Sequence, residues 1–202
     1  STEEFISELS RNSPAPGGGS VSALIGALGA SLGSMVASLS YEKKELFNNR
    51  SITGEIGIET QNLKDKLSWL VDEDTNAFNK VISANRLPSL TKEDKRRKSE
   101  AILNANKYAL EVPLETAKLC LEVLKTINRL INYCNPNSIS DAGVAAEVSL
   151  AGVRGAYMNV LINLISIEDK NYCKEKKQEV EKLVLKAEKD HSLIYNKIKK
   201  SL

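Results

Sequence analysis

Two long segments of this chain are almost free of charge, and they limit the possible folds more than any other feature. The segment 21–39 has no charged residue, and after its first residue the segment 141–167 is interrupted only by Glu147 and Arg154. Both segments are rich in Gly, Ala and Ser, so helices formed by them can approach their neighbours closely. Helices that are apolar on nearly every side are expected at the centre of a bundle.

The remaining segments have the pattern of amphipathic helices that wrap such a centre. A long one is predicted over 56–84, where apolar residues recur at helical spacing. Its apolar stripe consists of Ile56, Leu63, Leu67, Leu70, Phe78 and Val81. Thr91 is expected to cap the next helix, and Pro113 should kink or divide it, because proline removes a backbone donor. No segment alternates like a strand, so the sequence predicts an all-α helical bundle in one domain, 1–202, with two buried small-residue-rich central helices.

Bulk properties exclude several classes of partner. The segment 21–39 is about long enough to span a bilayer, but its small residues gain little from lipid, so we predict a buried helix and no membrane insertion. The net charge of +2 argues against a nucleic-acid-binding protein, which usually has a dense basic face. The small residues also favour close helix pairing, possible within one chain or across a homodimer.

The cysteines indicate a reduced compartment. Cys120, Cys134 and Cys173 are odd in number, lie far apart and form no CxxC pair. A disulfide framework and a structural zinc site are therefore not predicted. The first residues also lack the basic-then-apolar pattern of a signal peptide. We accordingly expect a cytoplasmic protein without a bound metal.

The scarcity of histidine narrows the possible chemistry. The only histidine, His191, is in phase with Ala187 and Ile194 in the charged C-terminal helix, so we expect it at a packing edge. A mechanism that needs a Ser-His-Asp or Cys-His arrangement has little support. Acid–base work would then fall to carboxylates, lysine or tyrosine.

Asp74 is the carboxylate whose position is most unusual. It lies four residues after Leu70 and four before Phe78, on the apolar stripe of the 56–84 helix. A carboxylate on a buried face must be paired, hydrogen-bonded or shifted in pKa. It is therefore either a catalytic acid or base, or half of a structural ion pair, and the helical phase does not choose between these.

Two helix starts and three buried polar residues are further candidates. Asp141 falls in the first turn after 137–140, where the helix dipole favours a carboxylate, although Ser138 or Ser140 could simply cap the helix. The loop 14–20 can present backbone N–H groups to a ligand, or it can be an ordinary helix-breaking turn. Arg154, Asn159 and Asn163, inside the second uncharged segment, need polar partners in the protein or in a ligand.

Four blocks in order together resemble the family of formiminotetrahydrofolate cyclodeaminases and methenyltetrahydrofolate cyclohydrolases. The blocks are 14–24, 71–78, 137–146 and 155–164. The resemblance implies an all-helical fold, assembly as dimers, and a reduced folate as substrate without a separate cofactor. The reaction would be hydrolysis of 5,10-methenyltetrahydrofolate to 10-formyltetrahydrofolate, or cyclisation of 5-formiminotetrahydrofolate with release of ammonia. The alternative is a helical scaffold or oligomerisation protein of the same fold without catalysis.

On this resemblance we expect a site with the following roles. Asp141 would stabilise the cationic one-carbon centre, and Asp74 would act as acid or base, with Lys43 as a competing candidate. The substrate-binding residues would be Gly17, Gly18, Gly19, Ser20, Asn137, Ser140 and Asn163.

Overall fold

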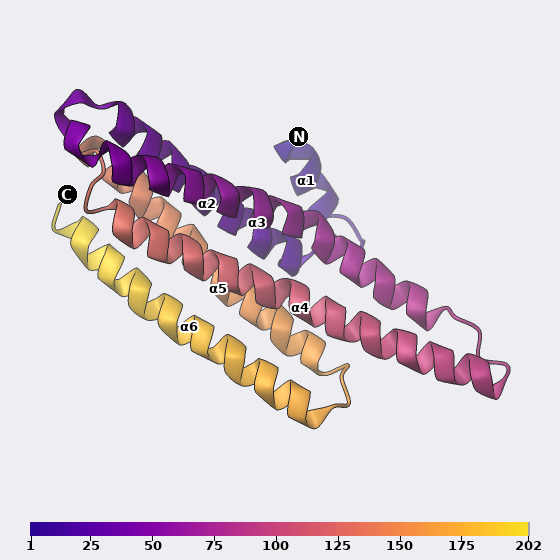
Figure 1. Cartoon of the computed structure of the whole chain (residues 1–202). Helices are drawn as coiled ribbons and strands as arrows, with labels where there is room; N and C mark the ends of the chain where they lie inside the picture. Colours follow the sequence, from indigo (N-terminus) through magenta and orange to yellow (C-terminus); the bar gives the residue numbers. More distant parts are fainter. Residues whose placement is uncertain (202) are drawn as a thin grey trace.

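A computed structural model describes residues 1–201 and confirms the predicted all-α class. Within this range the chain forms six α-helices and two short 3-10 helices and no β-strand (Figure 1). The α-helices are α1 (Thr2–Leu9), α2 (Gly18–Glu42), α3 (Arg50–Asn85), α4 (Lys92–Leu130), α5 (Ile139–Leu164) and α6 (Lys170–Lys199), and the 3-10 helices are η1 (Lys44–Asn49) and η2 (Pro136–Ser138).

The two small-residue helices, α2 and α5, run antiparallel and in direct contact. A β-carbon at Gly29 would overlap the Ser149 hydroxyl of α5, and one at Gly26 would overlap the Cys120 sulfur of α4. Only glycine permits these approaches, so the composition of α2 is explained by packing. By length and composition α2 could also cross a membrane, and 61% of its most apolar window is buried in the protein.

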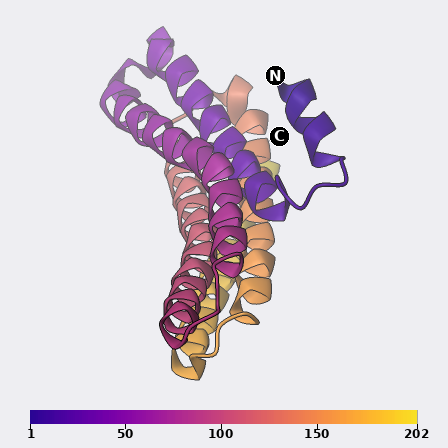
Figure 2. The same ribbon diagram turned by 90° about the vertical axis from the view of Figure 1, so that its right-hand side faces the viewer.

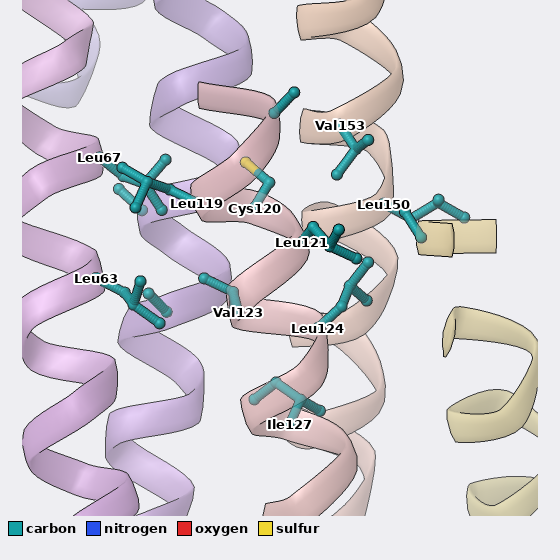
Figure 3. Close-up of a cluster of buried hydrophobic side chains, with 14 of the residues drawn as sticks. Leu63, Leu67, Leu119, Cys120, Leu121, Val123, Leu124, Ile127, Leu150 and Val153 are labelled. Atoms are coloured by element: carbon teal, nitrogen blue, oxygen red, sulfur yellow. The ribbon is translucent and has the colours of Figure 1, made fainter. Parts of the chain in front are cut away.

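The core lies where α2, α3, α4 and α5 meet. α4 supplies the largest share of it, with Leu124 and Ile127 fully buried, and α3 contributes Leu63 and Leu67 (Figure 3). α6 covers the side formed by α4 and α5, whereas α1 lies apart from the bundle in both views (Figures 1 and 2). α1 has no buried residue, so the bundle proper begins at α2.

Pro113 does not divide its helix, and a side chain from another helix supplies the hydrogen bond that proline cannot make. α4 continues without a break from Lys92 to Leu130, although Pro113 cannot donate to the carbonyl of Ala109 one turn earlier. The side-chain amide of Asn163 on α5 donates to that carbonyl instead, at 2.7 Å. The half-buried acceptor that proline leaves unpaired is thereby satisfied.

The helix starts and the place of His191 can be compared directly with what the sequence indicates. Thr91 and Asp94 form the expected capping box at the start of α4. Ser20 does not cap α2, because the helix already begins at Gly18. His191 sits at the edge between α5 and α6 as predicted, with its Nε2 2.8 Å from a carboxylate oxygen of Glu147.

Candidate active site

A pocket of about 280 Å³ lies directly beyond the N-terminus of α2. There α3, α4 and α5 continue past the end of α2, so they enclose the space that α2 would otherwise fill. We call this space the Asp74 pocket. Its lining residues are Pro14, Ala15, Gly17, Gly18, Gly19, Asp74, Ala77, Phe78, Val81, Asn106, Ala109, Asn159, Asn163 and Ser166.

Asp74 is held rigidly at the end of α2. Its Oδ2 accepts hydrogen bonds from the backbone N–H of Ser20 at 2.9 Å and from the Ser20 hydroxyl at 3.0 Å. Ser20 is fully buried. A β-carbon at position 19 would overlap the Asp74 carboxylate, so glycine at this position allows the two helices to meet. The pairing satisfies one of the free N–H groups of α2, as a capping residue would.

The environment of Asp74 changes its acidity. Burial raises the pKa of Asp74 above its ordinary value of 3.8, and the two bonds from Ser20 only partly oppose this effect. No cation pairs with the carboxylate among the ion pairs formed by residues 1–201. The reading of Asp74 as half of a structural ion pair is therefore not supported. A carboxyl group of raised pKa in a pocket is a candidate general acid or base.

Three asparagines give the opposite wall of the pocket its polarity. Asn159 donates its side-chain NH₂ to the Gly155 carbonyl at 2.9 Å, and Asn163 donates to Ala109 at 2.7 Å. Asn106 donates to the carbonyl of Ser166 at 2.9 Å. Because each NH₂ group is bound to backbone, the amide oxygens remain as acceptors for the N–H groups of a ligand.

The other predicted site residues lie at the opposite end of α2. Lys43 follows the last residue of α2, and its Nζ donates to Oδ1 of Asn135 at 3.1 Å. The same oxygen accepts the backbone N–H of Asn137 at 3.1 Å. Asp141 lies in the first turn of α5, just after Ser140. We call Lys43, Asn135, Asn137, Ser140 and Asp141 the Lys43 corner.

The predicted site is thus divided within one chain. The Asp74 pocket gathers Gly17, Gly18, Gly19 and Asn163 around Asp74, with Ser20 behind it. The 25 residues of α2 separate this pocket from the Lys43 corner by about 37 Å at the usual helical rise. No single bound molecule of modest size can touch both groups in one chain.

The remaining sequence candidates are placed elsewhere. Arg154 pairs with Glu188 of α6 at 2.7 Å and does not line the pocket. Ser138 is the first residue before α5 but makes no side-chain capping bond. No group of three or more His, Cys, Asp or Glu side chains within residues 1–201 is arranged to hold a metal ion.

Several residues of the Asp74 pocket and the Lys43 corner were not predicted as part of a site. Phe78 and Val81 lie one and two turns after Asp74 on the same face, so helical phase alone could have identified them. Asn106 and Asn135 had no comparable signal, because they reach their places only through contacts between distant helices.

A second polar cluster lies on the other side of α3. Glu73 accepts hydrogen bonds from the Tyr108 hydroxyl and from Asn76, and it pairs with Lys80 at 3.3 Å. The bond from Tyr108 is the main reason that the pKa of Glu73 is lowered. The groove next to this cluster measures about 680 Å³ and is separate from the Asp74 pocket. The bond from Tyr108 joins α4 to α3 at Glu73, the residue next to Asp74.

Comparisons with known proteins identify the relationship. A family model described as formiminotransferase-cyclodeaminase matches residues 1–182. The chain belongs to this family. A methenyltetrahydrofolate cyclohydrolase of Methylorubrum extorquens is 34% identical, over 98% of this chain and 95% of that protein. A formimidoyltransferase-cyclodeaminase of Gallus gallus is 35% identical, over 94% of this chain and 35% of that protein.

A solved structure from the same family has the same fold. The formiminotetrahydrofolate cyclodeaminase of Thermotoga maritima superposes with a TM-score of 0.87 and 27% identity, covering 98% of this chain and 96% of that chain. The family that the sequence blocks indicated is confirmed by these relatives.

Proposed function

We propose that this protein is a folate one-carbon enzyme that hydrolyses 5,10-methenyltetrahydrofolate to 10-formyltetrahydrofolate in the Asp74 pocket. The observation that carries the proposal is a carboxyl group of raised pKa, held by Ser20, in a pocket lined by amide oxygens. The full-length match to the Methylorubrum extorquens cyclohydrolase supports this direction of the chemistry.

Hydrolysis needs one proton to be moved from water to nitrogen. Water attacks the cationic carbon that bridges the two folate nitrogens, and ionised Asp74 accepts the proton of the attacking water. As the carbon–nitrogen bond breaks, protonated Asp74 returns that proton to the departing nitrogen. The remaining hydroxyl proton leaves to solvent as the formyl C=O forms, which accounts for the positive charge of the substrate. Ser20 fixes Oδ2 of the carboxylate, so Oδ1 is the oxygen that carries the proton. A raised pKa makes this carboxylate a stronger base than an ordinary aspartate, which favours uptake of the proton from water.

The binding groups suit a reduced folate. The pterin ring and its amine carry several N–H donors, which the side-chain oxygens of Asn159 and Asn163 can accept. The N–H groups of Gly18 and Gly19 at the start of α2 can donate to a carbonyl oxygen. Phe78 and Val81 provide an apolar surface for the ring. Neither a metal nor a nicotinamide is needed, because the substrate itself supplies the electrophilic carbon.

The second candidate is cyclisation of 5-formiminotetrahydrofolate with release of ammonia, a lyase reaction. The Thermotoga maritima cyclodeaminase, which matches this chain over nearly its whole length, favours it. A folate nitrogen attacks the formimino carbon, and the departing amine needs a proton. Protonated Asp74 would donate that proton, so the same side chain serves both reactions.

The proposal includes the form and location of the enzyme. We propose a cytoplasmic homodimer that binds neither nucleic acid nor membranes. Exposed apolar side chains on α2 and α5, among them Leu28 and Met158, support a protein partner, because monomers rarely expose contiguous apolar patches. The three free thiols support a reducing compartment.

The test is direct. Purified protein is mixed with 5,10-methenyltetrahydrofolate, and the loss of its near-ultraviolet absorbance is compared with a blank and with Asp74→Asn. Accelerated loss that Asp74→Asn abolishes supports hydrolysis. Formation of the same chromophore from 5-formiminotetrahydrofolate, with ammonia release, supports cyclisation. If neither reaction is accelerated, the protein is a scaffold that keeps the fold without the chemistry.

A further inference from the structure

The amides of the Asp74 pocket all have the same orientation. Asn106, Asn159 and Asn163 each direct the side-chain NH₂ group to a backbone carbonyl, at 2.9, 2.9 and 2.7 Å. A carbonyl oxygen only accepts hydrogen bonds, so the partner determines which end of each amide is bound. The oxygen of each amide is therefore the end that is left for a ligand.

Asn163 is the amide with the most unusual partner. The carbonyl that it meets, that of Ala109, lies inside α4, where the backbone N–H four residues later normally occupies such a carbonyl. Pro113 stands at that position and has no N–H to donate. Its ring also crowds the carbonyl one turn earlier, which opposes a regular helical bond. Asn163 thus has an acceptor that the helix itself does not occupy.

The other two amides do not depend on a proline. Asn159 donates to Gly155, one turn earlier in the same helix, and that carbonyl also serves the regular helical bond. Asn106 of α4 donates to the carbonyl of Ser166, which lies in the turn after α5. Asn106 and Asn163 thereby join α4 and α5 in opposite directions. Only the bond of Asn163 requires that a residue of α4 lacks its N–H.

The oxygen of the Asn163 amide is open to the pocket. Asn163 lines the pocket, and within residues 1–201 its Oδ1 accepts no hydrogen bond and is not enclosed by protein atoms. An asparagine amide that is not held turns readily by half a rotation, because its two ends have nearly the same shape. The bond to Ala109 therefore decides whether this point of the wall accepts or donates a hydrogen bond.

We propose that Pro113 is a positioning residue for ligand recognition, because it reserves the Ala109 carbonyl for Asn163 and so holds the Asn163 oxygen toward the ligand. The Asp74 pocket then selects a nitrogen heterocycle that offers an N–H group at this point, as the reduced pterin of the proposed substrate does. Pro113 is buried and does not line the pocket, so it acts only through Asn163. The inference rests on the proposed function for the identity of the ligand, whereas the link between Pro113 and Asn163 does not depend on it.

The first test is the effect of Pro113→Ala on the kinetics. This variant supplies a backbone N–H that competes for the Ala109 carbonyl, so the Asn163 amide is free to turn. We expect KM for 5,10-methenyltetrahydrofolate to rise about three- to tenfold, the effect of losing one neutral hydrogen bond. The value of kcat should stay within about twofold, because the bonds between Ser20 and Asp74 are untouched. An unchanged KM would refute the proposal.

A double-mutant cycle on KM separates positioning from a merely structural effect of the proline. Asn163→Ala removes the amide and should raise KM by a similar factor. In that background Pro113→Ala should cause no further rise, because its effect on the ligand passes through Asn163. An equal rise with and without Asn163 would overturn the proposal. Pro88→Ala, in the exposed loop between α3 and α4, is the matched control for removal of a proline and should change neither KM nor kcat.

NMR tests the orientation of the amide without turnover. The side-chain NH₂ signals of Asn163 are assigned by their loss in Asn163→Ala, and their proton exchange with water is measured in nitrogen-15-labelled protein. The bond to Ala109 should slow this exchange in the wild type, and Pro113→Ala should accelerate it about threefold or more, the effect of one weakened hydrogen bond. The same exchange rate in both proteins would show that Pro113 does not hold the amide.

The two tests distinguish this inference from the proposed function. If the wild type accelerates neither folate reaction, the proposed function is refuted, and the NMR comparison still decides whether Pro113 holds Asn163. If the wild type is active but Pro113→Ala retains both its KM and its amide exchange rate, the inference is refuted and the proposed function stands. The proposal expects a raised KM together with faster exchange in Pro113→Ala.

Discussion

Asn163 is predicted to stabilise α4 by replacing the donor that Pro113 lacks. Its side-chain NH₂ lies 2.7 Å from the Ala109 carbonyl, the acceptor that residue 113 would normally satisfy. Asn163→Ala removes this bond and leaves a half-buried carbonyl unpaired, which costs about 1–3 kcal/mol. The pocket beside it admits water, so we expect the lower half of that range. For a chain of this length the loss corresponds to a fall in Tm of about 2–6 °C.

A double-mutant cycle separates the effect of this hydrogen bond from a general effect of packing. Pro113→Ala supplies a backbone N–H that can donate to Ala109 within α4. In that background Asn163→Ala should cost less by about 1 kcal/mol or more, because the carbonyl keeps a partner. Asn163→Asp is the matched control, since it keeps the size but replaces the donor with an acceptor, and it should destabilise at least as much as Asn163→Ala.

The assay is urea unfolding followed by circular dichroism, at one fixed protomer concentration because a dimer is stabilised by mass action. The four chains of the cycle are compared by their free energies of unfolding. An equal cost of Asn163→Ala with and without Pro113 would refute the account of the uninterrupted helix. So would an Asn163→Asp variant as stable as the wild type.

Five further outcomes follow from the site and the exposed apolar face of α2 and α5. Asp74→Asn should lower turnover by about a hundredfold or more, the scale of a lost acid–base group, while retaining an acceptor for Ser20. Because burial raises the pKa of Asp74 in the folded state, its ionisation destabilises the fold. The free energy of unfolding of the wild type relative to Asp74→Asn should therefore fall as the pH rises from about 3.8, the ordinary value, through the higher folded value, and a difference that rises with pH in urea titrations would contradict this. Gly19→Ala should reduce kcat at least about tenfold with unchanged helix content, since its β-carbon would displace the Asp74 carboxylate. An unaffected rate would show that the present placement of the Asp74 carboxylate is not required for catalysis. Prolonged dialysis against EDTA should leave the rate unchanged, and a loss restored by one divalent metal would show that a cofactor has been missed. Leu28→Glu combined with Met35→Glu should halve the mass measured by light scattering and remove activity, whereas the surface control Lys66→Glu should do neither.

Much of the fold could be predicted from the sequence because its signals are local. The apolar stripe of the 56–84 segment predicted α3, although the helix begins earlier, at Arg50. The capping box of Thr91 and Asp94 is contained in four residues and was predicted correctly. The effect of Pro113 could not be predicted, because the compensating donor, Asn163, comes from another helix.

The site was predictable in part for the same reason. Helical phase placed Asp74 on a buried face, and the structure has it there with a raised pKa. Its partner Ser20 is 54 residues away in the sequence, so no local pattern links the two. The Asp74 pocket lies at the N-terminus of α2, and the Lys43 corner lies at its C-terminus. Only the three-dimensional arrangement shows that the two groups of residues lie at opposite ends of α2.

The most direct measurement is the structure of the protein with bound 5-formyltetrahydrofolate, a reduced folate that neither reaction consumes. We predict density for the ring system in the Asp74 pocket, with the one-carbon group next to Asp74 and the amide oxygens of Asn159 and Asn163 facing the ring nitrogens. Density in the groove beside Glu73 and Tyr108, on the other side of α3, would contradict the assignment of the site, as would an empty Asp74 pocket at saturating ligand.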